Sequence, residues 1–225
     1  MSVVAEIRAT LAAHGDPERA LAQQAYMKSA LPYRGIAKPE LTRLLRPMLR
    51  GYAPDGRAAW ERDVRELWDG VAFREEWYAV IALLRHPRVR PWLDADALPL
   101  LRHLLATGAW WDVVDEVATH PLRIALADHP ADVTPTVRAW ASDEDPWVRR
   151  ASVICQVGRR GEADLDLLAH AVEANLDDTS FWLRKAIGWA LRDQARTDPA
   201  WVRDHVDRWG SRLSGLSRRE ALKHL

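Results

Sequence analysis

The segment DPWVRRA at residues 145–151 returns as TSFWLRKA at residues 179–186. Trp147 corresponds to Trp182, an offset of 35 positions that the arginines and alanines of the two copies share. Repeats of about this length that contain helical patterns are typical of stacked helix pairs of the HEAT type. A stack of such pairs curves and presents a concave groove that is lined by one helix of each pair. The segment therefore predicts a helical-repeat fold.

Helix-start signals extend this prediction along the chain. Asp16-Pro17 and Asp198-Pro199 each place a capping carboxylate before a first-turn proline, as Asp145-Pro146 does, and Pro39-Glu40 opens a further apolar segment. No strand-like alternation lasts for more than a few residues. We therefore expect an all-α protein, a HEAT-like helical-repeat solenoid with a concave groove, that forms one domain over residues 1–225.

Composition excludes several classes of protein. The chain carries 32 Lys and Arg against 32 Asp and Glu, so its zero net charge argues against an indiscriminate nucleic-acid binder, although charge can still be sorted onto faces. No apolar run approaches the roughly 18 residues that a membrane span needs, and the amphipathic N-terminus does not resemble a signal peptide. Cys155 lies in an apolar run, where we expect a packed side chain in a cytoplasmic protein.

The 12 tryptophans are unusual beside 2 Phe and 4 Tyr, and one cluster of them carries acids. In WWDVVD at residues 110–115, Trp111 and Asp115 are four residues apart and share one face of a helix. Trp110 and the valines are expected to point to the core. An indole beside a carboxylate suits a ligand that is flat and cationic, or about to become cationic.

A second face combines an indole with cations. On a helix over residues 181–196 the apolar stripe consists of Leu183, Ala186, Ile187, Ala190 and Leu191. The opposite side carries Lys185, Trp189, Arg192 and Arg196. This pattern fits either a binding face or a solvated basic face whose tryptophan packs on a neighbouring repeat.

The pattern leaves Arg150 with two interpretations, a phosphate contact or a structural ion pair with a neighbouring acid. The nucleotide-binding, hydrolase and zinc-protease motifs are absent from the chain, and its eight histidines lack ligand spacing on a shared face. We therefore expect neither a metal nor a cofactor.

Several tryptophan-rich strings together resemble the AlkD-like DNA alkylation repair family. In chain order they are YMKSALPYRGIAKPELTRLLR (26–46), RELWD (65–69), WWDVVD (110–115), DPWVRRA (145–151), FWLRKAIGWALRDQARTDP (181–199) and LSGLSRREALKHL (213–225). The resemblance covers nearly the whole chain. It implies HEAT-like repeats around a basic DNA-binding groove, and metal-free excision of purines alkylated at N3 or N7.

The resemblance also implies roles for individual residues. The catalytic carboxylate falls on Asp115, the two indoles that flank the sugar on Trp111 and Trp189, and the phosphate-anchoring arginine on Arg150. The region that touches DNA includes Tyr26 and the loop with Lys38, where Ala37 and Lys38 replace a polar residue and a hydroxyl common in the family. Lys185 and Arg192 would hold further phosphates.

The resemblance implies a glycosylase that acts on double-stranded DNA from the backbone side, without flipping the base, and we expect it to be a monomer. A fixed carboxylate would stabilise positive charge on the deoxyribose as the glycosidic bond breaks. Two alternatives are an inactive relative that recognises bent or branched DNA, and a helical scaffold that binds a protein partner.

Overall fold

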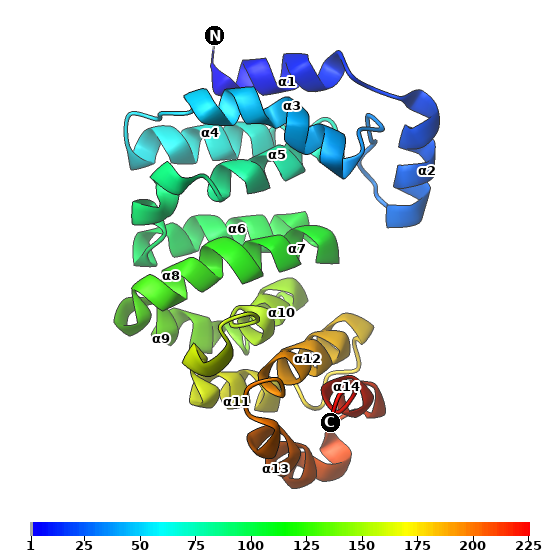
Figure 1. Cartoon of the computed structure of the whole chain (residues 1–225), viewed down its shortest axis with the longest axis vertical. Helices are drawn as coiled ribbons and strands as arrows, with labels where there is room; N and C mark the ends of the chain where they lie inside the picture. The colour runs from blue at the N-terminus through cyan, green and yellow to red at the C-terminus, as the bar shows by residue number, and fades with distance from the viewer. Residues whose placement is uncertain (1) are drawn as a thin grey trace. The chain divides into compact units, whose positions relative to one another are not determined.

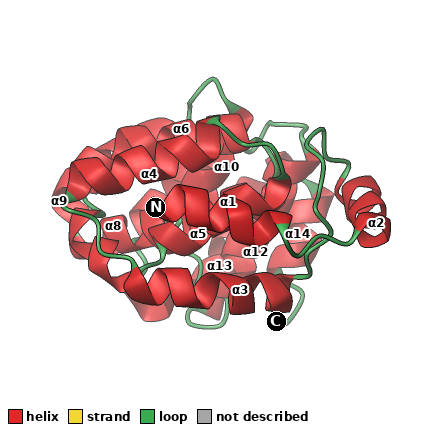
Figure 2. Ribbon diagram, turned by 90° about the horizontal axis from the view of Figure 1, so that it is seen from above, coloured by secondary structure: helices red, strands yellow, loops and turns green. Residues whose placement is uncertain are grey.

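The computed structural model describes residues 2–225, and within them every regular element is a helix, with no strand (Figure 2). The predicted all-α class is confirmed. The helices group into two compact units, one that ends at Trp92 and one that runs from Leu93 to Leu225.

The first unit is built on α1, which packs against α3, α4 and α5. Its elements are α1 (Val3–Ala12), α2 (Pro17–Met27), α3 (Lys38–Gly51), α4 (Arg57–Asp69), α5 (Arg74–Leu84) and the short 3-10 helix η1 (Pro87–Trp92). The core contains Ile7 and Leu11 from α1 together with Trp60 and Leu67 from α4, all fully buried. By contrast, α2 contributes no buried residue.

The second unit is centred on α10, which packs against α6, α7, α9, α11 and α12 (Figure 1). Its α-helices are α6 (Leu98–Gly108), α7 (Trp111–Val117), α8 (Arg123–Asp128), α9 (Pro130–Trp140), α10 (Pro146–Ile154), α11 (Leu165–Glu173), α12 (Phe181–Gln194), α13 (Pro199–Trp209) and α14 (Gly215–Ala221). Its other helical turns are η2 (Ala95–Ala97), η3 (Ala118–Leu122), η4 (Arg160–Glu162) and η5 (Gly210–Arg212).

The predicted helix starts are confirmed, with their physical cause. The carboxylate of Asp145 accepts hydrogen bonds from the amides of Trp147 and Val148, and Asp16 and Asp198 cap α2 and α13 in the same way. Each satisfies amides that the first turn of a helix leaves without a partner. Glycines mark two of the helix ends: α3 ends at Gly51, and Gly210 follows the last residue of α13.

The two copies of the repeated segment occupy equivalent places in the second unit. Trp147 lies in the first turn of α10 and Trp182 in the first turn of α12, and their ring centroids are 5.9 Å apart. Helices α10 and α12 also pack directly on each other. Corresponding positions of successive repeats therefore lie side by side, which is what stacked helical repeats require.

One glycine in the first unit is conformationally required. Gly35 has φ of +87°, and a Cβ added to it would lie 2.0 Å from the carbonyl oxygen of Asp16. A side chain would be excluded by both the backbone angle and this contact. The glycine lets the loop before α3 pass directly against the start of α2.

None of the helices over residues 2–225 combines the length and apolar character of a bilayer span.

Candidate active site

Asp115 and Arg150 form a two-pronged ion pair between α7 and α10. Arg150 donates from Nε to Oδ1 of Asp115 over 2.7 Å and from Nη2 to Oδ2 over 2.8 Å. Its Nη1 donates to the main-chain carbonyl of Trp182 at the start of α12. The side chain of Arg150 is 5% exposed and that of Asp115 is 18% exposed. The pair thus ties three helices together while leaving the carboxylate partly open to solvent.

Two opposing effects set the ionisation of Asp115. Burial raises the pKa of this carboxyl above its ordinary value, while the hydrogen bonds and the charge of Arg150 act in the lowering direction. The net direction is upward, because removal of water from the carboxylate is the larger effect. Arg150 is therefore the group that favours the ionised form of Asp115.

A π-helical turn begins three residues after Asp115, at the end of α7. It spans Ala118–Leu122, contains Pro121, and joins α7 to α8. The hydroxyl of Thr119 donates to the carbonyl of Asp115 over 2.6 Å, which satisfies an acceptor at this irregular turn. Proline has no amide hydrogen, so it favours such an interruption of the regular ladder. The backbone of Asp115 is thereby fixed from its C-terminal side.

Trp111 begins α7 and is partly exposed, whereas Val113, Val114 and Val117 of the same helix are buried. This separation confirms the predicted face for the valines. Trp110 precedes the helix as its N-cap residue in extended backbone, and its indole Nε1 is buried, which agrees in part with the expectation that Trp110 points to the core. It is partly exposed and contacts Trp147 and Trp182, with ring centroids 6.0 and 5.3 Å away.

The second predicted face lies on α12, as the pattern indicated. The five residues of the apolar stripe are buried, Trp189 is partly exposed, and Arg196 is exposed beyond the end of the helix. Lys185 and Arg192 both contact the carboxylate of Glu220 on α14: the Lys185 Nζ lies 2.9 Å from Oε1, and Arg192 Nη1 donates to Oε2. The hydrogen bond from Lys185 lowers the pKa of Glu220, so this carboxyl is ionised at neutral pH.

The two ion pairs occupy one register of the repeat. Asp115 and Arg150 are 35 residues apart, and so are Lys185 and Glu220. Arg150 and Lys185 differ by the same offset, so the four residues are equivalent positions of successive repeats. At one end of this series the acid Asp115 pairs with the base Arg150 of the next repeat. At the other end the base Lys185 pairs with the acid Glu220 of the next repeat.

Tyr26 and Lys38 lie in the first unit. Tyr26 is 80% exposed on α2, and Lys38 is the first residue of α3. The loop that leads to Lys38 is held by Glu75, a fully buried carboxylate that accepts the amides of Arg34, Gly35 and Ile36. The sequence pattern did not single out Glu75, because an acid in the first turn of a helix is common for electrostatic reasons alone.

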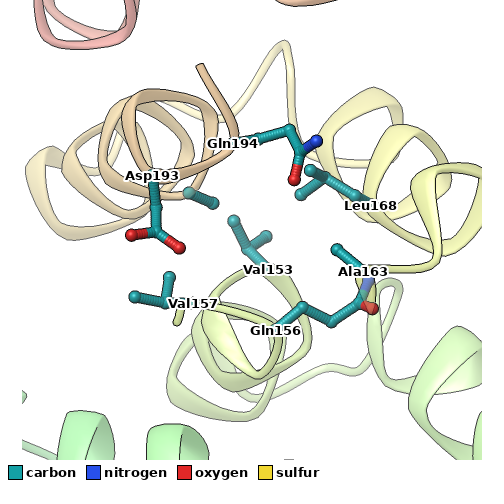
Figure 3. Close-up of a pocket in the computed structure, with 8 residues that line it drawn as sticks. Val153, Gln156, Val157, Ala163, Leu168, Asp193 and Gln194 are labelled. Carbon is teal, nitrogen blue, oxygen red and sulfur yellow. The ribbon is translucent and has the colours of Figure 1, made fainter. Parts of the chain in front are cut away.

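Other features of the second unit do not resemble a catalytic site. A small pocket is lined by Val153, Gln156, Val157, Ala163, Leu168, Ala190, Asp193 and Gln194 (Figure 3). It has room for about one water molecule, and neither Asp115 nor the candidate indoles line it. Cys155 is a packed side chain, as predicted, and its burial raises the pKa of the thiol to about 12. Within residues 2–225 no cluster of His, Cys, Asp and Glu forms a candidate metal site.

Residues 7–225 match the family model described as DNA alkylation repair enzyme. The chain belongs to this DNA alkylation repair enzyme family. The match includes both units and every candidate site residue named above. No curated protein sequence is detectably similar to the chain.

Solved structures agree with this family assignment. A protein described as "Predicted DNA alkylation repair enzyme from Enterococcus faecalis" is 26% identical, with a TM-score of 0.83, over 94% of this chain and 97% of that one. The alkylpurine DNA glycosylase AlkC of Pseudomonas fluorescens, bound to DNA that contains an abasic site analogue, has a TM-score of 0.59 at 15% identity, over 98% of this chain and 60% of that one. Smu.31 of Streptococcus mutans has a TM-score of 0.61 at 16% identity, over 84% of this chain and 98% of that one. The last two share the helical fold.

Proposed function

We propose that this DNA alkylation repair family member is an AlkD-like monofunctional DNA glycosylase. It hydrolyses the N-glycosidic bond of purines that carry a positive charge from alkylation at N3 or N7, in duplex DNA, as the first step of base excision repair. It acts as a monomer, with neither metal nor cofactor. The observation that carries the proposal is the carboxylate of Asp115, which Arg150 holds in a fixed orientation while leaving it partly open to solvent.

The substrate explains why one carboxylate is sufficient. An alkylated purine that is already cationic leaves as a neutral base, so the enzyme need not protonate it. Positive charge develops on the deoxyribose as the bond lengthens, and the ionised Asp115 stabilises this charge and orients the attacking water. A preorganised charge of this kind contributes a few kcal/mol to the barrier, or about 10² to 10³ in rate.

Trp111 and Trp189 complete the proposed site. The face of an indole ring carries negative electrostatic potential, which attracts a cationic sugar or base and excludes bulk water. Both rings are partly exposed, on helices α7 and α12 that pack against the same helix α10. Partly exposed indoles suit a substrate that stays in the duplex, so we propose that excision occurs without base flipping.

The test is the release of N7-methylguanine from a methylated duplex, corrected for spontaneous depurination. We expect Asp115→Asn to lower the release rate by about 10² or more. The matched control is Asp204→Asn, which removes the same charge from an exposed ion pair with Arg208 on α13 and should leave release unchanged. Circular dichroism and thermal melting must show that each variant is folded, because Asp115 also has a structural partner.

One observation favours a second candidate function. Asp115 and Arg150 satisfy each other, and a pair of this kind is also found in proteins where it has a purely structural role. An inactive relative that binds bent or branched DNA would keep the pair. In that case the wild type binds duplex DNA but releases neither N7-methylguanine nor N3-methyladenine above background. Absence of both release and binding would leave a scaffold for a protein partner.

A further inference from the structure

Glu220 holds two cations to which the family resemblance assigned DNA phosphates. Its Oε1 lies 2.9 Å from the Nζ of Lys185, and its Oε2 accepts a hydrogen bond from Arg192. Lys185 is 39% exposed, Arg192 is 23% exposed and Glu220 is 20% exposed, so solvent reaches all three side chains. We call these three residues the Glu220 cluster.

The two cations of the Glu220 cluster flank one of the proposed catalytic indoles along α12. On α12, Lys185 lies four residues before Trp189 and Arg192 three residues after it, so both flank the ring on its own helix face. A phosphate beside the sugar that Trp189 faces would meet these two cations first. The cluster is therefore placed where a DNA backbone would lie in the proposed function.

The carboxylate is held in this place by close packing of α14 on α12. Gly188 lies on α12 against Glu220, and a Cβ added to Gly188 would lie 2.5 Å from the Cβ of Glu220 and 3.1 Å from the carbonyl oxygen of Ser217. The absent side chain lets the backbone of α14 approach. Glu220 thereby reaches Lys185 and Arg192 from one side, and its position is set by the helix pair.

The net charge of the Glu220 cluster determines how strongly it attracts a DNA phosphate. Lys185 and Arg192 alone would present two positive charges beside Trp189, whereas the three groups together carry one. A phosphate that binds these cations must share them with a carboxylate or displace it, and the carboxylate repels the phosphate. The pair at the other end of the repeat register differs in its base, because Arg150 is 5% exposed whereas Lys185 is 39% exposed.

We propose that Glu220 is a built-in competitor for the DNA phosphodiester that Lys185 and Arg192 bind beside Trp189, and that it limits the affinity of the protein for undamaged duplex DNA. The inference rests on the proposed DNA-binding function. A glycosylase that searches an excess of undamaged DNA requires such a limit, since non-specific binding depends on phosphate contacts.

The experiment measures binding of a fluorescein-labelled undamaged duplex by anisotropy, over a range of salt concentrations, for the full chain. Glu220→Gln keeps the shape of the side chain and removes its charge. We expect it to bind several-fold more tightly than wild type, with a salt slope that is steeper by about one, as for one additional neutralised phosphate. Glu220→Asp keeps the charge and should stay close to wild type. Asp204→Asn is the matched control for loss of one acid from an exposed ion pair on α13.

A second set of variants ties the effect to the two cations. In a Lys185→Gln/Arg192→Gln background, Glu220→Gln should change neither the affinity nor the salt slope, because the competition has been removed. Thermal melting of every variant verifies that α14 remains packed on α12.

The outcomes separate this inference from the proposed function. Equal binding by Glu220→Gln and wild type, or weaker binding by Glu220→Gln, overturns the competitor role while the glycosylase proposal stands. An equal gain for Asp204→Asn overturns it too, since net charge alone would then explain the effect. If neither wild type nor Glu220→Gln binds duplex DNA at low salt, both the inference and the proposed function fail.

Discussion

Arg150 is 5% exposed and its partner Asp115 is 18% exposed, so a change at Arg150 leaves a largely desolvated carboxylate without its counter-charge. We expect Arg150→Gln to lower the free energy of unfolding by about 3–5 kcal/mol at neutral pH. Urea unfolding followed by circular dichroism measures this. Arg208→Gln, at an exposed pair with Asp204, should cost less than about 1 kcal/mol. Equal costs for the two variants would contradict the structural role of Arg150.

Asp115 also makes the free energy of unfolding depend on pH. Because burial raises the pKa of Asp115 above its unfolded value, the native state binds this proton more tightly, and the stability contributed by the group falls as pH rises through the folded pKa. Without Arg150 the pKa of Asp115 rises further. The destabilisation by Arg150→Gln should therefore shrink as pH is lowered into the acid range.

In the proposed function, catalysis requires the ionised form of Asp115. Excision should therefore decline as pH falls through the pKa of this carboxyl, at a pH above that of an ordinary aspartate. Arg150→Gln should move this acid limb to higher pH, since it removes the group that lowers the pKa. Single-turnover release of N7-methylguanine against pH, corrected for acid depurination, measures the limb. An unchanged limb in Arg150→Gln would mean that Asp115 is not the titrating group.

At the scale of elements, the packing of α14 on α12 depends on one helical glycine. Alanine at position 188 would improve helix propensity by about 1 kcal/mol, but its Cβ would lie 2.5 Å from the Cβ of Glu220. Overpacking of this kind costs about 1–3 kcal/mol, so Gly188→Ala should be no better than neutral and displace α14. Gly51→Ala is the control, because no atom lies within 4 Å of its added Cβ. Thermal melting should show Gly51→Ala at or above wild type, and a higher Tm for Gly188→Ala would contradict the close approach.

The helix starts could be predicted because their causes are local. The carboxylate of Asp145 caps amides two and three residues further on, and Asp198 caps in the same way, so the signal and the structure lie in the same turn. The position of Trp110 could not be predicted from a helical wheel. A wheel assumes that the helix includes the residue, whereas α7 begins after it.

At the scale of the whole molecule, DNA binding should depend on cations in the first unit as well as the second. Lys38 begins α3, at the end of the loop that Glu75 holds. We expect Lys38→Gln to reduce the salt slope of duplex binding by about one and to weaken binding equally for damaged and undamaged duplexes. Anisotropy titrations over a range of salt concentrations measure both. If Lys38→Gln and Arg208→Gln have the same salt slope of duplex binding, Lys38 does not contact a DNA phosphate.

The sequence by itself determined the all-helical class, the starts of α2, α3, α10 and α13, the 35-residue offset and the faces that carry Trp111, Asp115 and Trp189. These properties follow from periodicity and capping, which act over a few residues.

Tertiary structure alone decided which charges meet. It placed the guanidinium of Arg150 on Asp115, and it placed the carboxylate of Glu220 within reach of both Lys185 and Arg192. Such partners are 28 to 35 residues apart in the chain, so their contact depends on how neighbouring helices pack. A helical pattern shows which face a charge lies on, but the packing of the next repeat determines which opposite charge reaches it.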